Sequence, residues 1–302
     1  MTRPSDPLSG QAPTLYEVAP RDGLQNEAAS IPTAAKIAFI DRLSQAGLPA
    51  IEVTAFVRAD RVPQLADAEA VVAGITRRPG TRYSALVPNL EGLERAAAAG
   101  LAEVAVLSAS SETFSRRNVN QSVDESIATC GAVARAADAA GIRVRAYLST
   151  AFGCPFEGDV PVERVVALAA RLADLGVFEV AVSDTIGVAH PGQVRRVLTA
   201  LVQVLPVDRL ALHFHDTRGM AVANVLAAID YGIRTFDASA GGLGGCPFAP
   251  GSSGNVATES LIYLLNGLGY RMGVRADEVA AAGTSLEPHV RGRIVAVRHR
   301  PA

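Results

Sequence analysis

Two histidines lie two positions apart in a segment that is otherwise typical of a buried β-strand. His213 and His215 follow an apolar run that begins at Leu210, and Phe214 stands between them. Since successive side chains of a strand point to opposite faces, the two imidazoles point the same way. Burying imidazoles that have no polar partner costs free energy, so two of them on an apolar strand favour a shared metal ion or a paired catalytic task. A pair of hydrogen-bonded core histidines is the alternative, because short motifs often arise without function.

The basic residues restrict the chemistry further, because Lys36 is the only lysine among the 28 lysines and arginines. Enzymes that break or make a carbon–carbon bond beside a carbonyl stabilise the carbanion through a lysine Schiff base or through a metal ion. Lys36 falls in an amphipathic helix pattern at 33–46, opposite its apolar residues, and is expected to be solvated. A Schiff-base mechanism is therefore nearly excluded, and a metal is favoured.

Short apolar runs alternate with helical patterns along the chain. The eight predicted strands lie near residues 14–18, 50–54, 82–87, 103–107, 143–149, 178–182, 210–214 and 235–238. The eight helix patterns lie near residues 33–46, 65–74, 89–99, 122–140, 162–175, 191–204, 219–230 and 255–267. Eight such units with right-handed crossovers close most simply into a (β/α)8 TIM barrel of the α/β class. An open doubly wound sheet is the alternative, disfavoured because no Gly-x-Gly-x-x-Gly follows the first strand.

The barrel is predicted to form one domain over residues 14–283, which includes a ninth helix pattern at 275–282. Residues 1–13 are predicted to be a flexible N-terminus. Residues 284–302 are predicted to be a short, basic C-terminal tail that is solvated.

The barrel brings three distant motifs to one end, because active sites of this fold lie at the carboxyl ends of the strands. The first strand leads into Asp22, the seventh carries His213 and His215, and the eighth leads through a glycine-rich loop to Asn255. Strands seven, eight and one are neighbours in a closed barrel, so these four side chains are predicted to meet. Two imidazoles, a carboxylate and an amide oxygen suit Mg²⁺ or Mn²⁺ better than a structural zinc site. Zn²⁺ and Co²⁺ remain open, because softer metals also bind imidazole.

Composition and charge exclude several classes of protein. A net charge of −2 gives no electrostatic footprint for nucleic acid or an anionic membrane. No apolar run reaches the roughly 18 residues of a membrane helix, and residues 1–13 have no signal-peptide or transit-peptide character. The cysteines Cys130, Cys154 and Cys246 are three in number and far apart, so reduced thiols are expected. We therefore expect a cytoplasmic enzyme without nucleic-acid or membrane partners.

Four motifs spread over the chain form a recognisable set. They are Glu17-Val18-Ala19-Pro20-Arg21-Asp22-Gly23-Leu24-Gln25-Asn26-Glu27, Ser183-Asp184-Thr185-Ile186-Gly187-Val188, His213-Phe214-His215-Asp216-Thr217, and the loop from Gly242 to Asn255 that contains Cys246. In these motifs the chain resembles the 3-hydroxy-3-methylglutaryl-CoA (HMG-CoA) lyase family, from about Tyr16 to Gly283. The resemblance implies a carbon–carbon lyase that cleaves HMG-CoA, or a close 3-hydroxy-3-carboxymethyl acyl-CoA, by a retro-Claisen step. The products would be acetyl-CoA and acetoacetate or a related keto acid.

The same resemblance implies roles for the residues at the strand ends. A divalent metal, Mg²⁺ or Mn²⁺, would be held directly or through water by four side chains, which are Asp22, His213, His215 and Asn255. The metal would polarise the tertiary hydroxyl and a neighbouring carbonyl oxygen, and His213 would also move a proton. Arg21 would bind the substrate and stabilise the enolate of the departing acetyl-CoA.

The resemblance also implies candidates outside the metal set. Cys246 would assist proton transfer to the carbanion. Glu52 and Asp184, both at strand ends, would orient the substrate or relay protons, and Gln25 and Arg218 would contact the substrate. The family further implies an acyl-CoA substrate, a homodimer, and a place in leucine degradation and ketone-body formation.

Some features leave other interpretations open. Arg218 and Met220 stand where the lyases usually have tyrosine and glutamine, so a lyase for a different acyl-CoA is the first alternative. A condensing synthase of the isopropylmalate or homocitrate type would need further domains and an asparagine in place of Thr217.

The glycine-rich loop is also compatible with a phosphate site. A non-catalytic acyl-CoA-binding barrel would be expected to lose a metal ligand or Cys246, and this chain keeps both. The phrase Gly-Cys-Pro-Phe recurs at Cys154, so this phrase alone does not identify a catalytic thiol.

Overall fold

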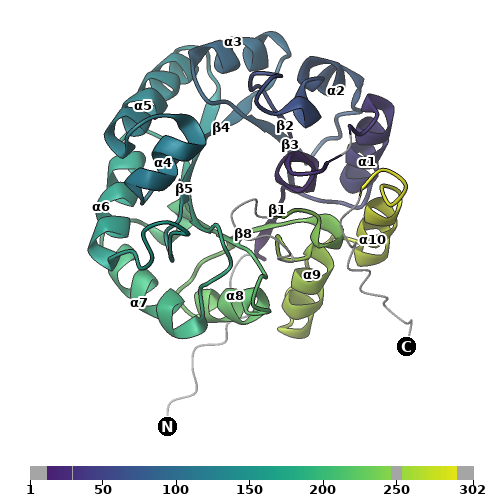
Figure 1. The fold of residues 1–302 in the computed structure, drawn as a ribbon. Coiled ribbons are helices and arrows are strands. Elements are labelled where there is room, and N and C mark those ends of the chain that lie inside the picture. The colour runs from purple at the N-terminus through teal and green to yellow at the C-terminus, as the bar shows by residue number, and fades with distance from the viewer. Residues whose placement is uncertain (1–11, 29, 246–253, 291–302) are drawn as a thin grey trace.

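A computed structural model describes residues 12–28, 30–245 and 254–290, which form a closed barrel of eight parallel strands inside a ring of helices (Figure 1). The strands are β1 (Thr14–Glu17), β2 (Ala50–Ala55), β3 (Arg82–Leu86), β4 (Glu103–Ala109), β5 (Arg143–Ser149), β6 (Glu179–Asp184), β7 (Leu210–Phe214) and β8 (Thr235–Ala238). They follow one another around the barrel, and β8 pairs with β1 to close it. The predicted (β/α)8 barrel is confirmed, and every predicted strand overlaps an observed one.

The helices form the outer layer. They are α1 (Thr33–Gln45), α2 (Ala68–Gly74), α3 (Leu90–Ala98), α4 (Glu112–Val119), α5 (Val123–Ala139), α6 (Val162–Ala173), α7 (Pro191–Leu201), α8 (Ala221–Ile229), α9 (Thr258–Gly267) and α10 (Ala276–Thr284). The last of them, α10, packs against α1 and α9, beside the point where the barrel closes (Figure 1).

One helix was not predicted, because α4 lies in a segment with no apolar periodicity. Its side chains are mostly exposed or half-buried, and only Phe114 and Ser115 are buried. The helix begins at Ser111, whose hydroxyl accepts a hydrogen bond from the backbone N–H of Phe114 at 3.1 Å. It ends at Asn120, which adopts a left-handed conformation with φ 57°. Its ends are thus set by a capping hydroxyl and a residue that tolerates positive φ, rather than by an apolar stripe.

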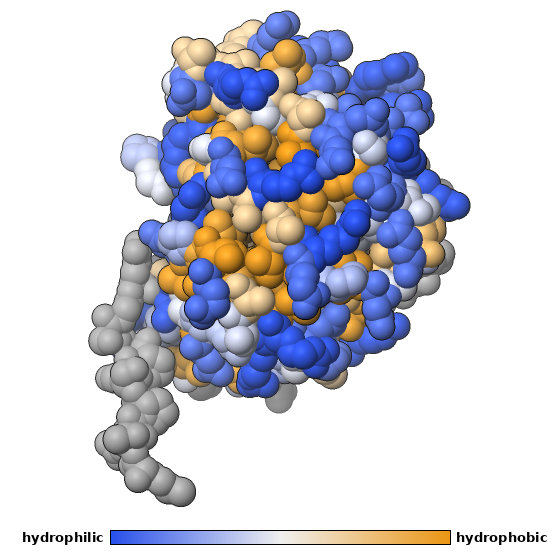
Figure 2. Space-filling model, turned by 90° about the vertical axis from the view of Figure 1, so that its left-hand side faces the viewer, coloured by the Kyte–Doolittle hydropathy of each residue, from blue (hydrophilic) through white to orange (hydrophobic). Residues whose placement is uncertain are grey.

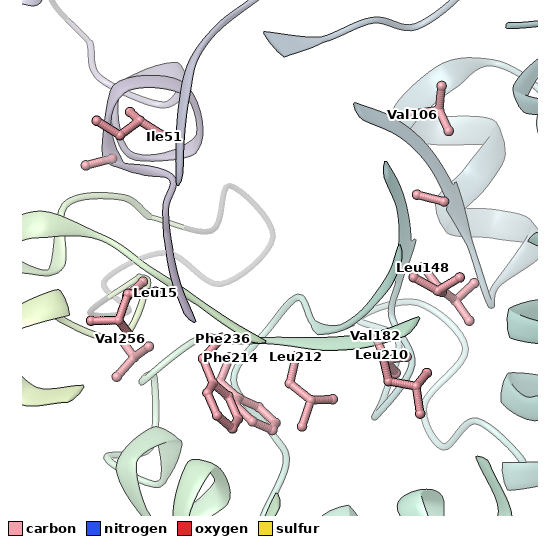
Figure 3. Packing of buried hydrophobic residues seen from close by; sticks show 14 of the residues in the cluster. Leu15, Ile51, Val106, Leu148, Val182, Leu210, Leu212, Phe214, Phe236 and Val256 are labelled. Atoms are coloured by element: carbon pink, nitrogen blue, oxygen red, sulfur yellow. The ribbon is translucent and has the colours of Figure 1, made fainter. Parts of the chain in front are cut away.

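Strand alternation separates the main core from the barrel interior. The residues of β7 that face the helices belong to the large apolar cluster drawn in part in Figure 3, which includes Leu210, Leu212 and Phe214. Ala211, one position along, belongs to a smaller cluster inside the barrel. His213 shares the direction of Ala211 and therefore also faces the interior. The sequence predicts that the two histidines share one face of the strand, and in the structure this face points to the barrel interior.

One side of the ring shows how polar and apolar residues are distributed on the outer surface. Figure 2 shows the side of the molecule that lies on the left in Figure 1, where hydrophilic residues cover most of the face and surround a central area of apolar ones. Helix α6 accounts for this distribution in part, since its Leu168 and Leu172 are buried whereas Glu163, Arg164 and Arg171 are exposed. The apolar stripe of the helix packs on the strands, and its charged residues remain in solvent.

Lys36 is not solvated, so that expectation is wrong. The side chain is 4% exposed, and its ammonium donates to the backbone carbonyl of Gln64 and to Asp67 Oδ1, the latter at 2.7 Å. Asp67 supplies the counter-charge that makes burial of the ammonium acceptable. Lys36 is absent from the residues that line the cavity at the strand ends, so it is not placed to form a Schiff base with a ligand bound there.

The beginning of the predicted tail packs on the barrel. Helix α10 extends to Thr284, and Leu286 in the following turn has no exposed surface and belongs to the main core. The expectation of a solvated tail is therefore wrong for Leu286, which contributes an apolar side chain to the core, whereas Thr284, Glu287 and Pro288 are exposed. Residues 1–11 and 291–302 lie outside the described residues. None of the described helices is long and apolar enough to cross a membrane.

The loop after β6 generates a stability prediction. Gly187 has φ +64°, and a Cβ at this position would lie 2.6 Å from the Cβ and 2.8 Å from the backbone nitrogen of Thr217. Gly187→Ala should lower the free energy of unfolding by about 3 kcal/mol, since the left-handed conformation costs about 1–2 kcal/mol and overpacking adds about 1–3 kcal/mol. Urea denaturation measures the loss.

Gly141→Ala is the matched control, because Gly141 has φ +68° but no heavy atom within 4 Å of its added Cβ. It should lose only the conformational cost, about 1–2 kcal/mol. Equal losses in the two variants would contradict the proposed clash with Thr217.

Candidate active site

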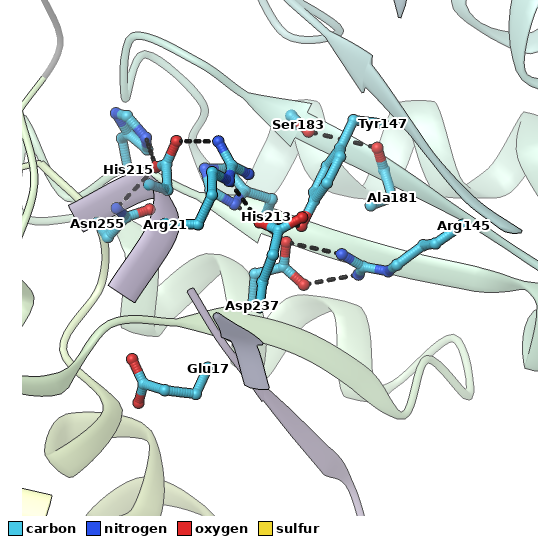
Figure 4. Close-up of polar contacts among 12 residues, drawn as sticks. Glu17, Arg21, Arg145, Tyr147, Ala181, Ser183, His213, His215, Asp237 and Asn255 are labelled. Atoms are coloured by element: carbon cyan, nitrogen blue, oxygen red, sulfur yellow. Dashed lines mark hydrogen bonds and ion pairs between the residues drawn. The ribbon is translucent and has the colours of Figure 1, made fainter. Parts of the chain in front are cut away.

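Four predicted metal-ligating residues meet at the carboxyl-terminal end of the barrel. Asp22 lies in the π-helical turn Ala19–Gly23 that follows β1, and His213 and His215 lie in and directly after β7. One ligand atom from each of these three side chains lies within 4.8 Å of the other two. Asn255 is drawn alongside in Figure 4, and its backbone bridges to that of His215.

The polar atoms of this cluster are incompletely paired. Asn255 Nδ2 donates to Asp22 Oδ2 at 2.9 Å and to the carbonyl of Leu243 at 3.3 Å. Asn255 Oδ1 and His215 Nδ1 are buried, and neither has a hydrogen-bond partner within the described residues. Buried polar atoms are rarely left unpaired in native proteins. Two such atoms beside a carboxylate and a second imidazole fit a bound divalent cation with nitrogen and oxygen ligands.

Asp22 is held in its ionised form. Burial by itself would raise the pKa of this carboxyl group, but Arg21 and the two histidines outweigh burial and hold the pKa well below its usual range. Arg21 Nη1 is 2.6 Å from Asp22 Oδ1, and His215 Nε2 is 3.8 Å from Asp22 Oδ2. Asp22 is therefore a carboxylate at neutral pH, which is the form that binds a metal.

Arg21 is fixed from several sides. Its Nε donates to Glu52 Oε2 at 2.5 Å and its Nη1 donates to Asp22, while the guanidinium carbon lies 5.3 Å from the centre of the Tyr147 ring. Burial favours a lower pKa for Arg21, but Glu52 and Asp22 raise it above its ordinary value, so the group is a permanent cation. Its Nη2 donates no hydrogen bond within the part of the chain that the structure describes. Arg21 lines the cavity and has one donor nitrogen left for a ligand.

Glu52 supports Arg21 rather than facing the cavity. It has no exposed surface and is absent from the residues that line the cavity. Burial raises the pKa of Glu52 above its ordinary value, although Arg21 opposes the shift. Tyr147 donates its hydroxyl to Glu52 Oε2 at 3.3 Å. The predicted role in orienting the substrate would therefore act through Arg21.

A buried ion pair that the sequence analysis did not identify lies against His213 (Figure 4). His213 Nδ1 is 3.1 Å from Asp237 Oδ2, and Asp237 accepts two hydrogen bonds from Arg145, at 2.6 and 3.1 Å. Arg145 has no exposed surface, and its Nε donates to Glu179 Oε2 at 2.7 Å. One signal was available, since an arginine and two carboxylates occupy inward-facing positions of three predicted strands.

A cavity of about 680 Å³ opens at the candidate metal site. Arg21, Asp22, His213 and His215 line it, together with the predicted substrate contact Gln25. Three arginines line another part of the same cavity; they are Arg58, Arg61 and Arg117. The cavity thus joins the candidate metal site to a cationic region, which suits an anionic ligand.

Three predicted residues are not brought to this cavity by the described contacts. Asp184 is buried, and its two oxygens accept the backbone N–H groups of Val188 and Ala189 at 2.9 and 3.0 Å. Arg218 is exposed, donates to the carbonyl of Gly187 at 3.3 Å, and is absent from the cavity lining. Cys246 lies outside the described residues. The roles proposed for these three side chains stay predictions.

Comparison with known proteins gives matches over nearly the whole chain. A family model described as HMGL-like matches residues 12–285. The mitochondrial hydroxymethylglutaryl-CoA lyase of Mus musculus is 50% identical over 269 residues, which are 89% of this chain and 83% of that protein.

Solved structures give the same result. The crystal structure of the Bacillus subtilis HMG-CoA lyase is 46% identical with a TM-score of 0.92, and the match covers 95% of this chain and 97% of that one. An Acinetobacter baumannii HMG-CoA lyase in complex with coenzyme A and 3-methylmalate is 35% identical with a TM-score of 0.90, and the match covers all of both chains. The resemblance carried by the four motifs is confirmed, and the chain belongs to the HMGL-like family.

Proposed function

We propose that this protein is a divalent-metal-dependent lyase that cleaves HMG-CoA to acetyl-CoA and acetoacetate. The observation that carries the proposal is the convergence of Asp22, His213 and His215 beside the fixed cation of Arg21, at the wall of one cavity. The names of relatives about 50% identical to this chain support the substrate. The Acinetobacter baumannii relative, crystallised with coenzyme A, supports an acyl-CoA ligand.

We assign the metal to Asp22, His213, His215 and Asn255, directly or through water, with Mg²⁺ or Mn²⁺ as the favoured ion. The carboxylate and the amide oxygen are hard ligands, and the two imidazoles suit Mn²⁺. When bound, such an ion polarises the tertiary hydroxyl and a neighbouring carbonyl oxygen of the substrate.

The side chains of the protein account for the proton and charge movements. His213 accepts the proton of the tertiary hydroxyl on its free ring nitrogen as the bond between C2 and C3 breaks, and in this role it holds the ion through water, because one lone pair cannot bind a proton and an ion together. The electron pair of that bond goes to C2, which gives the enolate of acetyl-CoA, while C3 becomes the ketone carbon of acetoacetate. Arg21 donates a charge-assisted hydrogen bond to the enolate oxygen. A proton delivered to C2 with the help of Cys246 completes acetyl-CoA.

Other parts of the proposal concern binding and context. The arginines of the cavity, Arg58, Arg61 and Arg117, complement the phosphates of coenzyme A, and Gln25 contacts the acyl portion. We propose a cytoplasmic homodimer in leucine degradation and ketone-body formation; some relatives carry "mitochondrial" in their names and others "cytoplasmic". The alternative is a lyase of the same mechanism for a different 3-hydroxy acyl-CoA, which Arg218 and Met220 favour because they differ from the usual family residues.

A substrate panel tests the function. Purified protein with Mg²⁺ or Mn²⁺ should release acetyl-CoA from HMG-CoA faster than from thioesters with a longer substituent at C3, as measured by mass spectrometry. Faster release from another thioester would select the alternative lyase. No release from any of them would contradict the lyase assignment.

The metal assignment predicts the effect of removing one imidazole. His215→Ala should lower Mn²⁺ affinity by more than about 100-fold, because loss of a ligand exceeds the 10–100-fold effect of losing an outer partner. Elemental analysis and calorimetry measure the binding, and circular dichroism checks that the barrel is folded. His190→Ala is the control, since His190 is exposed at the start of α7. Unchanged affinity in His215→Ala would remove His215 from the metal site.

The cysteine assignment is tested with a matched pair. Cys246→Ala should lower turnover at least about 100-fold while the metal stays bound, because proton transfer by a positioned group contributes about 10²–10⁴-fold. Cys154→Ala should keep its turnover, because Cys154 is buried, its thiol donates a hydrogen bond to Ser111 Oγ at 2.9 Å, and it is absent from the residues that line the cavity. Parental turnover in both variants would leave proton transfer to His213 alone.

A further inference from the structure

The two ring nitrogens of His213 have different surroundings. Nδ1 lies 3.1 Å from Asp237 Oδ2. The other nitrogen, Nε2, is the one left for the cluster with Asp22 and His215, whose ring centre lies 5.1 Å from that of His213. A neutral imidazole carries one proton, so the nitrogen that holds it decides whether His213 offers a lone pair to the cluster.

Asp237 is an acceptor only. Its Oδ1 accepts from Arg145 Nη2 at 2.6 Å, and its Oδ2 accepts from Arg145 Nη1 at 3.1 Å. Arg145 is a permanent cation, and its two terminal nitrogens donate to the two oxygens of Asp237, which is the geometry of a guanidinium paired with a carboxylate. An ionised carboxylate has no proton to donate. The proton of the His213–Asp237 hydrogen bond therefore belongs to Nδ1.

We propose that Asp237 is a positioning residue that fixes the Nδ1–H tautomer of His213, and thereby presents the lone pair of Nε2 to the metal site, directly or through water. The inference rests on the metal site proposed above. Asp237 acts through His213 alone, because it is 2% exposed and absent from the residues that line the cavity. Metal-bound imidazoles commonly depend on such an outer carboxylate.

The register of the barrel builds this contact into the fold. His213 of β7 is directly paired with Asp237 of β8. Both side chains face the interior, and neighbouring residues on one face of a sheet lie close together. Arg145 reaches Asp237 across the barrel from β5. His215 has no equivalent, because its Nδ1 has no hydrogen-bond partner within the described residues.

The tautomer is measured directly in the metal-free protein. Two-bond ¹H–¹⁵N correlation spectra of ¹⁵N-histidine-labelled protein distinguish a protonated ring nitrogen from one with a free lone pair, and a His213→Asn variant assigns the signals. Parent protein should show a protonated Nδ1 and a lone pair on Nε2 for His213. A protonated Nε2 in the parent would overturn the proposal without any further variant.

Asp237→Asn tests the cause. The shorter bond from Arg145 Nη2 should keep the amide oxygen at the Oδ1 position, while the longer bond from Arg145 Nη1 is lost and the NH2 group donates to His213 Nδ1. His213 should then carry its proton on Nε2, and Mn²⁺ affinity should fall about 10–100-fold. An unchanged tautomer or an unchanged affinity would overturn the proposal.

Glu179→Gln is the matched control, because Glu179 also binds Arg145 but does not touch His213. It removes a buried carboxylate from the same cluster, so it should lower thermal stability while the His213 tautomer and Mn²⁺ affinity stay as in the parent. An equal change of tautomer in Glu179→Gln would reduce Asp237 to a merely structural role. If Asp237→Asn does not fold, the spectrum of the parent still shows whether His213 carries its proton on Nδ1, and so still tests the proposal.

The outcomes separate this proposal from the proposed function. If the parent shows the Nδ1–H tautomer but binds no Mn²⁺, the proposed metal site is contradicted. The metal-dependent lyase function and the proposed effect of Asp237 on metal binding would then both be wrong. A parent that binds Mn²⁺ and cleaves HMG-CoA but shows a protonated Nε2 when metal-free would overturn the role of Asp237 alone.

Discussion

The guanidinium of Arg145 is the group on which the interior of the barrel depends. Asp237 and Glu179 are almost fully buried there, and removing one partner of a buried ion pair costs about 3–5 kcal/mol because the other charge is left uncompensated. Arg145 donates from all three of its nitrogens to these two carboxylates. Its guanidinium carbon lies 4.2 Å from the ring centre of Tyr16 and 4.8 Å from that of Tyr147. Because a buried charge is tolerated only when it is paired, this layer is confined to one arrangement, and the site at the strand ends is built on it.

A buried guanidinium paired with two carboxylates recurs around Arg21, closer to the carboxyl-terminal end of the barrel. There the guanidinium joins Glu52, which is buried, to Asp22, which faces the cavity. Tyr147 connects the two layers, since its ring lies near both guanidinium groups and its hydroxyl bonds to Glu52. The charges that would act on a substrate are thus held by buried partners before any ligand binds, so they need little reorganisation when charge develops on the substrate.

The sequence predicted the elements with strong periodicity and missed contacts between distant strands. Apolar runs located all eight strands, and barrel closure then placed Asp22 beside His213, because the fold itself makes β1, β8 and β7 neighbours. Helix α4 was missed because a capping hydroxyl, not an apolar stripe, defines it. Strand alternation indicates that Arg145 and Asp237 both face inward, but they lie 92 positions apart on strands that are not neighbours, so strand order does not indicate that they bond to each other. Lys36 was misjudged because its helical pattern does not reveal Asp67, which lies 31 residues away.

Asp184 shows that a position at the end of a strand does not by itself bring a side chain to the cavity. The alternation of the strand decides which of its side chains face the cavity. In β6, Glu179 bonds to Arg145 and Ala181 belongs to the interior cluster, so the odd-numbered residues face the interior. Asp184 must then face the helices, and its carboxylate does bind the backbone of the following loop. Its neighbour Ser183 has the inward direction and lines the cavity. A motif match places both residues at the active-site end, but only the period of the strand distinguishes the side chain that meets a ligand from the one that holds the loop.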